Sequence, residues 1–324
     1  NEVSQYPPSN IWVSGPHLEN LETHKQLGMN VTTSNGEVLS NCDVVFLGVK
    51  PGVLNNAIQG CLSTLPANVS SKNVLFVSML AGIDIKKIQQ AVSVLPITLN
   101  IVRIMPNTPM AVGAGICLYS VDDNVQLEQC VMLEKILKPC GLIEKIPETL
   151  MTSLGVLSGC GPAFMYVAIE ALADATVKQG APRDMATKLA AQVILGSGKM
   201  VLESGRHPAV LKDEVCSPGG STICGIAALE DGKMRLISLK LLLKGTRKQA
   251  NYECTLCFFF WTLGSKFQNY NFNYGGSTLS YSRHKSSPLH SRVNTFVTET
   301  GSCCCNYFVY CMYLYFQKKK QKAS

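Results

Sequence analysis

The chain lacks the features that would tie its larger part to nucleic acid or to a metal ion. Residues 1–240 carry 18 lysines and arginines against 20 aspartates and glutamates, so no basic surface for nucleic acid is expected there. The eight cysteines of this part stand singly, without the spacing of zinc ligands. We therefore expect no nucleic-acid partner, no metal, and thiols that stay reduced inside a cell.

The first thirty residues also lack a glycine-rich loop of the GxGxxG type, which normally holds a dinucleotide phosphate. Neither a signal peptide nor an arginine- and serine-rich presequence opens the chain. The expected location is the cytoplasm or the mitochondrion, and the sequence leaves the choice undecided.

The positive charge of the chain is concentrated after residue 240, where 11 basic residues face 2 acidic ones. This segment also holds 17 of the 24 aromatic residues and shows neither helical nor strand periodicity. We predict a disordered tail over residues 239–324. Its apolar run, Cys303–Phe316, is too short to span a bilayer comfortably, so a membrane partner is not expected, although a tail anchor stays an alternative.

Residues 11–150 alternate short apolar runs with helix-like segments, which favours a doubly wound α/β fold. The expected strands are Ile11–Val13, Val44–Val49, Val74–Val77 and Thr98–Ile104, and the expected helices are Leu18–Leu27, Val53–Leu65 and Ile85–Val94, the last capped by Asp84. We predict a Rossmann-like parallel sheet over residues 1–147.

Residues 148–238 are predicted to form an all-α domain. One helix is expected to start near Pro162 and end near Gly180, and a second to run over residues 183–202 and close at Gly205. Apolar residues surround much of these helices, which indicates burial between subunits. A compact bundle within one chain is the alternative.

The segment Ser217-Pro218-Gly219-Gly220-Ser221-Thr222 predicts a tight turn just before a helix. Backbone N–H groups that converge at such a helix start can bind a small anion, for example a carboxylate. The Thr222 hydroxyl would then reach whatever is attached to that anion. The alternative is an ordinary capping turn in which Ser221 or Thr222 caps the helix.

Residues 208–230 resemble the signature of the pyrroline-5-carboxylate reductase family, and the resemblance covers roughly residues 10–238. Further motifs in the same order are Asn10–Pro16, Thr33–Asn35, Val49–Pro51, Val77–Gly82, Arg103–Pro109 and Leu157–Phe164. The resemblance implies reduction of Δ1-pyrroline-5-carboxylate to L-proline with NADPH or NADH, by a homo-oligomer joined through the helical domain.

The resemblance also implies site residues. Gly219, Gly220, Ser221 and Thr222 would bind the substrate carboxylate, and Thr222 would hydrogen-bond or protonate the ring nitrogen. The positions implied around the cofactor are Ser14, Asn35, Val49, Lys50, Pro51, Ala81, Asn107, Glu148 and Glu214. For Glu148 and Glu214, a solvated surface carboxylate is an equal alternative, and Lys50 alone could be a surface lysine. No acid follows residues 11–13, which favours NADPH over NADH.

The chain departs from the family in having no first strand and no glycine-rich loop, so we expect weak cofactor binding and little activity of this chain. The alternatives are a non-catalytic oligomerisation subunit, an inactive fragment, and a related imine or β-hydroxyacid reductase.

Overall fold

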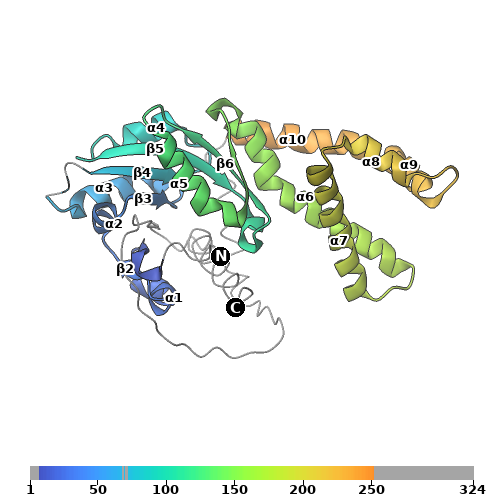
Figure 1. Ribbon diagram of the computed structural model, residues 1–324, viewed down its shortest axis with the longest axis horizontal. Helices are drawn as coiled ribbons and strands as arrows, with labels where there is room; N and C mark the ends of the chain where they lie inside the picture. The colour runs from blue at the N-terminus through green and yellow to red at the C-terminus, as the bar shows by residue number, and fades with distance from the viewer. Residues whose placement is uncertain (1–6, 68, 70–71, 252–324) are drawn as a thin grey trace. The chain divides into compact units, whose positions relative to one another are not determined.

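A computed structural model describes residues 7–67, 69 and 72–251 (Figure 1). The chain divides into two compact units, one containing the residues up to Gly159 and the other running from Cys160 to Lys248. The predicted tail, with the apolar run Cys303–Phe316, lies outside the described residues beyond residue 251.

The first unit is built on a five-stranded sheet. Its strands, in spatial and chain order, are β3 (Val44–Leu47), β4 (Asn73–Ser78), β5 (Thr98–Pro106), β6 (Gly115–Val121) and β7 (Gly141–Lys145). β3, β4 and β5 are parallel, β6 runs antiparallel to β5, and β7 is parallel to β6. Every residue of β3 is buried, as expected for a parallel strand covered on both faces.

A separate pair of parallel strands, β1 (Trp12–Ser14) and β2 (Asn30–Thr32), precedes this sheet. In a doubly wound fold the family's first strand would join these two parts. The predicted α/β class is therefore confirmed. The single continuous sheet is corrected to two sheets, because no described strand pairs with both β1 and β3.

Helices alternate with the strands of this unit along the chain, as expected for an α/β fold. The α-helices are α1 (Glu22–Gln26), α2 (Asn35–Asn41), α3 (Leu54–Thr64), α4 (Ile85–Val92) and α5 (Leu127–Leu137). Short 3-10 turns occupy Pro8–Asn10, Leu18–Leu21, Pro51–Val53, Thr108–Val112, Lys138–Cys140 and Glu148–Leu150. The helix expected over residues 18–27 is therefore a 3-10 turn followed by one short α-helix.

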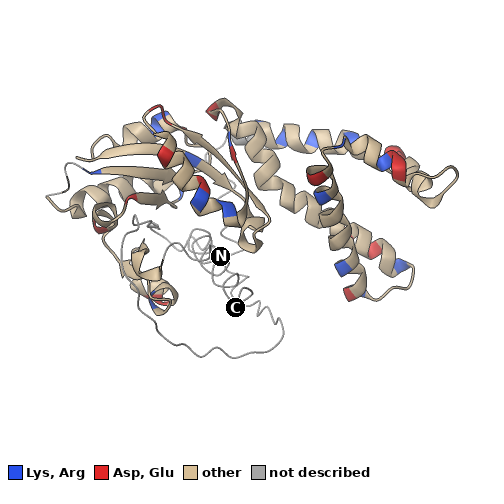
Figure 2. Ribbon diagram, in the orientation of Figure 1, with Lys and Arg blue, Asp and Glu red and all other residues tan. Residues whose placement is uncertain are grey.

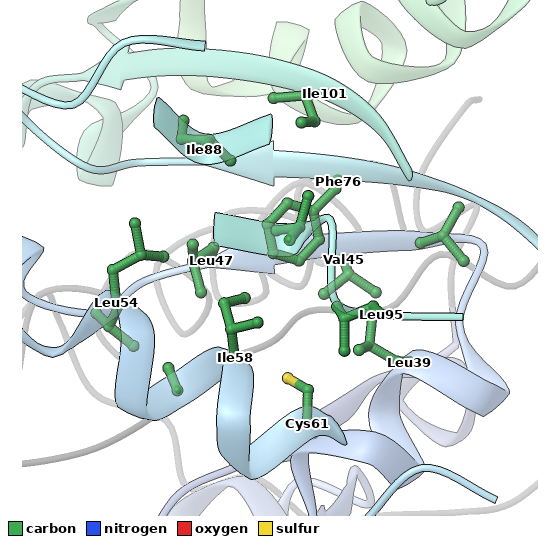
Figure 3. Close-up of a cluster of buried hydrophobic side chains, with 14 of the residues drawn as sticks. Leu39, Val45, Leu47, Leu54, Ile58, Cys61, Phe76, Ile88, Leu95 and Ile101 are labelled. Atoms are coloured by element: carbon green, nitrogen blue, oxygen red, sulfur yellow. The ribbon is translucent and has the colours of Figure 1, made fainter. Parts of the chain in front are cut away.

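The core of the unit lies on both faces of the five-stranded sheet. On one face, Ile58 and Cys61 of α3 point toward Val45 and Phe76 of the sheet (Figure 3). On the other face, α5 contributes Leu133, Ile136 and Leu137 to a second cluster with strand residues. These two layers cover the faces of the sheet, and loops follow the carboxyl ends of its parallel strands.

The buried cysteines belong to this core. Burial raises the pKa of the Cys61 thiol to about 12, and burial also raises the pKa of the Cys117 thiol. A thiol with a raised pKa stays protonated at neutral pH and reacts slowly. None of the eight cysteines among the described residues forms a disulfide, and the reduced state of the thiols stays a prediction.

The predicted N-cap of α4 is confirmed, because an Asp84 carboxylate oxygen accepts a hydrogen bond from Lys87 N at 2.8 Å. We expect Asp84→Ala to lower the free energy of unfolding by about 1 kcal/mol, since an alanine leaves that amide without its acceptor. Chemical denaturation measures the change. Asp84→Asn is the control and should keep most of the stability; an equal loss in both variants would contradict the capping role.

The second unit is entirely helical. Its helices are α6 (Met151–Lys178), which begins in the first unit, α7 (Arg183–Ser204), α8 (Pro208–Val215), α9 (Ser221–Asp231) and α10 (Met234–Asn251). Gly205 closes α7 with a φ of 62°, as predicted. The expected tail boundary at residue 239 is wrong, because α10 continues through Ser238 to Asn251 with a run of leucines and lysines that favours helix.

Helix α6 also corrects the prediction that a helix starts near Pro162. It runs without interruption from Met151, and Pro162 lies inside it. No charged residue occurs in α6 before Glu170, which leaves its first half uncoloured in Figure 2. Among the described residues, the stretch Glu148–Lys178 is long and apolar enough to cross a membrane by length and composition alone. The same composition suits a helix packed against other helices.

Candidate functional site

The residues implied at the cofactor lie where strands of the first unit end. Ser14 ends β1, Val49-Lys50-Pro51 follow β3, Ala81 follows β4, and Asn107 follows β5. In open α/β sheets, ligands bind beyond the carboxyl ends of the parallel strands. The topology therefore gives these residues, which are far apart in sequence, the placement expected of a dinucleotide site.

At the end of β1, the buried Ser14 hydroxyl donates a hydrogen bond to Asn35 Oδ1 at 2.8 Å. Asn35 is the first residue of α2, whose N-cap is Ser34. The sequence interpretation missed Glu37, whose carboxylate accepts a hydrogen bond from Thr32 Oγ1 at 2.6 Å at the end of β2. The pattern of a serine followed three residues later by glutamate could have indicated it.

The loops after β3 and β4 are well defined. Val49 and Pro51 are buried, Lys50 is half-buried, and Pro51 starts a 3-10 turn closed by a bond from Val53 N to Lys50 O at 3.0 Å. Ala81 is half-buried and is followed by Gly82, whose φ of +77° suits a residue without a β-carbon. Buried residues therefore anchor the loop after β3 in the core, and Gly82 gives the loop after β4 its turn.

Asn107 has a structural task that the sequence did not indicate. Its Nδ2 donates to the carbonyl of Ser158 at 3.0 Å, and its Oδ1 accepts from Ile116 N at 2.9 Å. In a helix the carbonyl of Ser158 would accept from the N–H of residue 162, four positions on. Residue 162 is a proline without an N–H. The Asn107 amide therefore donates to the carbonyl that Pro162 leaves without a partner. This hydrogen bond allows α6 to continue beyond the proline.

This arrangement predicts a measurable coupling between Asn107 and Pro162. Asn107→Ala should lower the free energy of unfolding by about 1–3 kcal/mol, because a buried carbonyl and a buried amide lose their partners. In a Pro162→Ala background the helix regains its own N–H donor, so the same change should cost less. Chemical denaturation of both single variants and the double variant measures the coupling. Strictly additive losses would contradict the assignment.

Glu148 is only partly exposed, and one of its oxygens has two donors. Glu148 Oε1 accepts a hydrogen bond from Ile85 N at 2.8 Å and lies 3.2 Å from Arg103 Nη1. The alternative of a freely solvated carboxylate is therefore wrong for this residue. Its direct contact with a cofactor stays a prediction.

In the second unit, the predicted turn precedes helix α9 as expected. Gly219 has a φ of +68°, and Gly220 is the N-cap of α9, closing the turn through a bond from its N–H to Ser217 O at 3.0 Å. Since the N-cap is a glycine, neither Ser221 nor Thr222 caps the helix, which corrects the capping alternative. Both hydroxyls, and the N–H groups of residues 221–223, have no hydrogen-bond partner among the described residues.

The turn can therefore receive an anion. Three consecutive amides at the start of an 11-residue helix point outward without acceptors, and the positive end of the helix dipole adds to their attraction. The half-buried Thr222 places a hydroxyl beside them. Such an arrangement binds a carboxylate and offers one further hydrogen bond to the group that carries it.

Glu214 lies on α8 and is paired at the surface. Its two carboxylate oxygens accept from the two terminal nitrogens of Arg206, with Arg206 Nη1 at 2.9 Å from Oε2. The hydrogen bond from Arg206 lowers the pKa of the Glu214 carboxyl, so this side chain stays ionised at neutral pH. The structure thus favours the surface-carboxylate alternative for Glu214 within its own unit.

The described residues fit part of a nicotinamide dinucleotide. Ser14 and Asn35 can serve the adenosine end, and the loops at Val49–Pro51 and Ala81–Gly82 can serve the rest. A glycine-rich loop between a strand and a helix, which would cradle the phosphates, is absent from the described part of the chain before β1. The described residues therefore include loops suited to parts of the cofactor, but none of those before β1 forms a cradle for its phosphates.

Two family models match this chain. "Pyrroline-5-carboxylate reductase dimerisation" matches residues 148–251, which ends where α10 ends, and "NADP oxidoreductase coenzyme F420-dependent" matches residues 2–82. The first match supports the correction of the tail boundary, because it includes all of α10.

Curated relatives carry the same name over most of this chain. Pyrroline-5-carboxylate reductase 3 of Danio rerio is 42% identical over 233 residues, covering 72% of this chain and 78% of the relative. Pyrroline-5-carboxylate reductase of Arabidopsis thaliana is 36% identical over 243 residues, covering 75% and 85%.

Solved structures agree in fold. The NADP-bound pyrroline carboxylate reductase of Plasmodium falciparum is 31% identical with a TM-score of 0.66, covering 76% of this chain and 89% of that one. The pyrroline-5-carboxylate reductase of Coxiella burnetii is 30% identical with a TM-score of 0.68, covering 76% and 90%.

Proposed function

The chain belongs to the pyrroline-5-carboxylate reductase family, and we propose that its function is the reduction of Δ1-pyrroline-5-carboxylate to L-proline with NADPH or NADH. The observation that carries this proposal is the turn before α9, whose unpartnered amides and free Thr222 hydroxyl suit a small cyclic imine bearing a carboxylate. The relatives that match this chain are named for the same activity.

The turn performs two tasks in this proposal. The amides of Ser221 and Thr222 bind the substrate carboxylate, since a helix N-terminus attracts an anion and the glycines keep side chains out of its way. The Thr222 hydroxyl donates a hydrogen bond to the ring nitrogen, which must gain a proton during the reaction. Neither task needs a metal or a covalent nucleophile, and orientation of two bound reactants supplies most of the acceleration.

The cofactor is held at the strand ends of the first unit. Ser14 and Asn35 bind the adenosine end, while Val49, Lys50, Pro51 and Ala81 line the remainder. When bound, the nicotinamide supplies the hydride for the imine carbon. No acid ends β1 beside Ser14, which leaves room for a 2′-phosphate and favours NADPH.

The second unit joins copies of the chain into a homo-oligomer. Large apolar side chains stand exposed along its helices, among them Tyr166, Val167, Leu189, Val193 and Leu202. Exposed apolar surface on this scale is typical of an interaction surface. The proposed location is the cytoplasm or the mitochondrion, since cysteines that stand singly, as in residues 1–240, are typical of a reducing compartment.

A second candidate function follows from the divided sheet. No described strand pairs with both β1 and β3, whereas the dimerisation family model matches the helical residues 148–251. The chain would then act as a non-catalytic subunit that assembles with intact family members.

The deciding experiment is oxidation of NADPH and NADH by the purified 324-residue chain, with and without pyrroline-5-carboxylate. Substrate-dependent turnover supports the reductase. No turnover, together with co-purification of an intact family member, supports the subunit. Turnover on another cyclic imine but not on pyrroline-5-carboxylate would contradict both.

A further inference from the structure

Glu148 joins three elements of the first unit through one oxygen. It lies on the 3-10 turn just before α6, and its Oε1 accepts from Ile85 N at the start of α4 and faces Arg103 Nη1 on β5. Ile85 is 63 residues from Glu148, and Arg103 is 45 residues away. A carboxylate from a late segment therefore holds the beginning of a helix that follows β4.

Arg103 makes this contact costly to lose. The residue is 6% exposed, and its neighbours across the sheet are Ser78 on β4 and Ser120 on β6, which carry no charge. Among the residues that the structure describes, Glu148 is the acid within ion-pair distance of this guanidinium. A buried cation that loses its counter-charge is strongly destabilising, so Arg103 fixes Glu148 where it lies.

The contact with Ile85 fixes one end of the loop between β4 and α4, residues 79–84. The other end is held by Met79 N, which donates to Leu47 O at 3.1 Å, and by Leu80 N, which donates to Ser78 Oγ at 3.3 Å. Ala81, one of the residues proposed at the cofactor, lies between these two anchors. The negative charge of Glu148 also suits the positive end of the α4 dipole.

We propose that Arg103 and Glu148 form a positioning pair that sets the conformation of the loop 79–84 and so places Ala81 against the cofactor. The role of the loop as a cofactor loop rests on the proposed function. The pair acts through Ile85 N, and Glu148 itself is a positioning residue. This assignment replaces direct contact between the Glu148 carboxylate and the cofactor.

Hydrogen–deuterium exchange of the 324-residue chain tests the pair without any need for activity. Glu148→Ala removes the acceptor, and exchange of residues 80–88 should rise about tenfold, while exchange in β4 and β6 should rise much less. Glu148→Gln keeps an acceptor oxygen for Ile85 N and should raise exchange less. Glu144→Ala, an exposed glutamate on β7, is the matched control and should leave residues 80–88 unchanged.

A titration with NADPH accompanies the exchange measurement, and Glu148→Ala should weaken binding about tenfold. Weaker binding with unchanged exchange of residues 80–88 would show direct contact and overturn the proposal. Exchange that rises equally in β4, β6 and the loop would also overturn it, because the pair would then only stabilise the fold. If no variant binds NADPH, the proposed function fails, and the exchange comparison still decides the role of the pair.

Discussion

Affinity for NADPH is expected to rise by about 100-fold or more when the family's first strand, glycine-rich loop and following helix are added ahead of β1. The strand would pair with both β1 and β3 and join the two sheets into one. The loop would bring backbone N–H groups and a helix N-terminus to the phosphates, which have no such partners in the described residues before β1. The dissociation constant can be measured by quenching of protein fluorescence or by enhancement of nicotinamide fluorescence.

The control for this experiment separates the sheet from the loop. A second extension carries the same strand and helix but has valines at the loop glycines, so it can repair the sheet and cannot approach the phosphates closely. We expect this version to raise the stability of the first unit with little gain in affinity. Equal affinity of the unextended chain and the glycine-containing version would show that the central cradle is dispensable.

Thr222→Ala should lower kcat for pyrroline-5-carboxylate by about 100-fold, measured in the extended chain where cofactor binding is strong. Within residues 219–222, only Ser221 and Thr222 carry side-chain hydrogen-bond donors. The Thr222 hydroxyl has no competing partner among the described residues. Without it, the ring nitrogen loses its hydrogen bond in the transition state. The substrate carboxylate is bound by backbone amides, so KM should change much less than kcat.

Thr222→Ser is the matched variant for this prediction, because it keeps the hydroxyl and removes only a methyl group. It should retain most of the turnover. NADPH affinity should be the same in wild type and both variants. Should Thr222→Ala raise KM and leave kcat intact, the hydroxyl would serve substrate binding alone and would not stabilise the transition state.

Much of the first unit could be predicted from apolar runs. The strands at residues 44–49 and 74–77 are apolar runs interrupted only by Gly48, and a buried parallel strand leaves such a run. The run at residues 98–104 is still mostly apolar, although it contains polar residues. β2, with the sequence Asn30-Val31-Thr32, was missed because three residues of mixed polarity carry no period. β7 was missed because three of its five residues are exposed and its apolar run is only Leu142-Ile143.

In the candidate site, too, only the features set by neighbouring residues could be predicted. The turn 217–222 could be predicted because proline and glycine act locally on their own backbone angles. The tasks of Asn107 and Glu148 could not, because their partners lie 51 and 63 residues away and depend on the fold. Helix α10 was missed because the aromatic tail that follows it dominated the interpretation of residues 239–251.

The bond between Asn107 and the Ser158 carbonyl also bears on how this chain could have evolved. A proline that arose at position 162 before an amide donor stood at position 107 would have left a buried carbonyl bare, at a cost comparable to a sizeable share of a domain's stability. The reverse order is mild, since an asparagine at 107 already finds Ile116 N as a donor. The order in which the two residues were acquired is therefore constrained, and a lineage that loses Asn107 should lose the proline first.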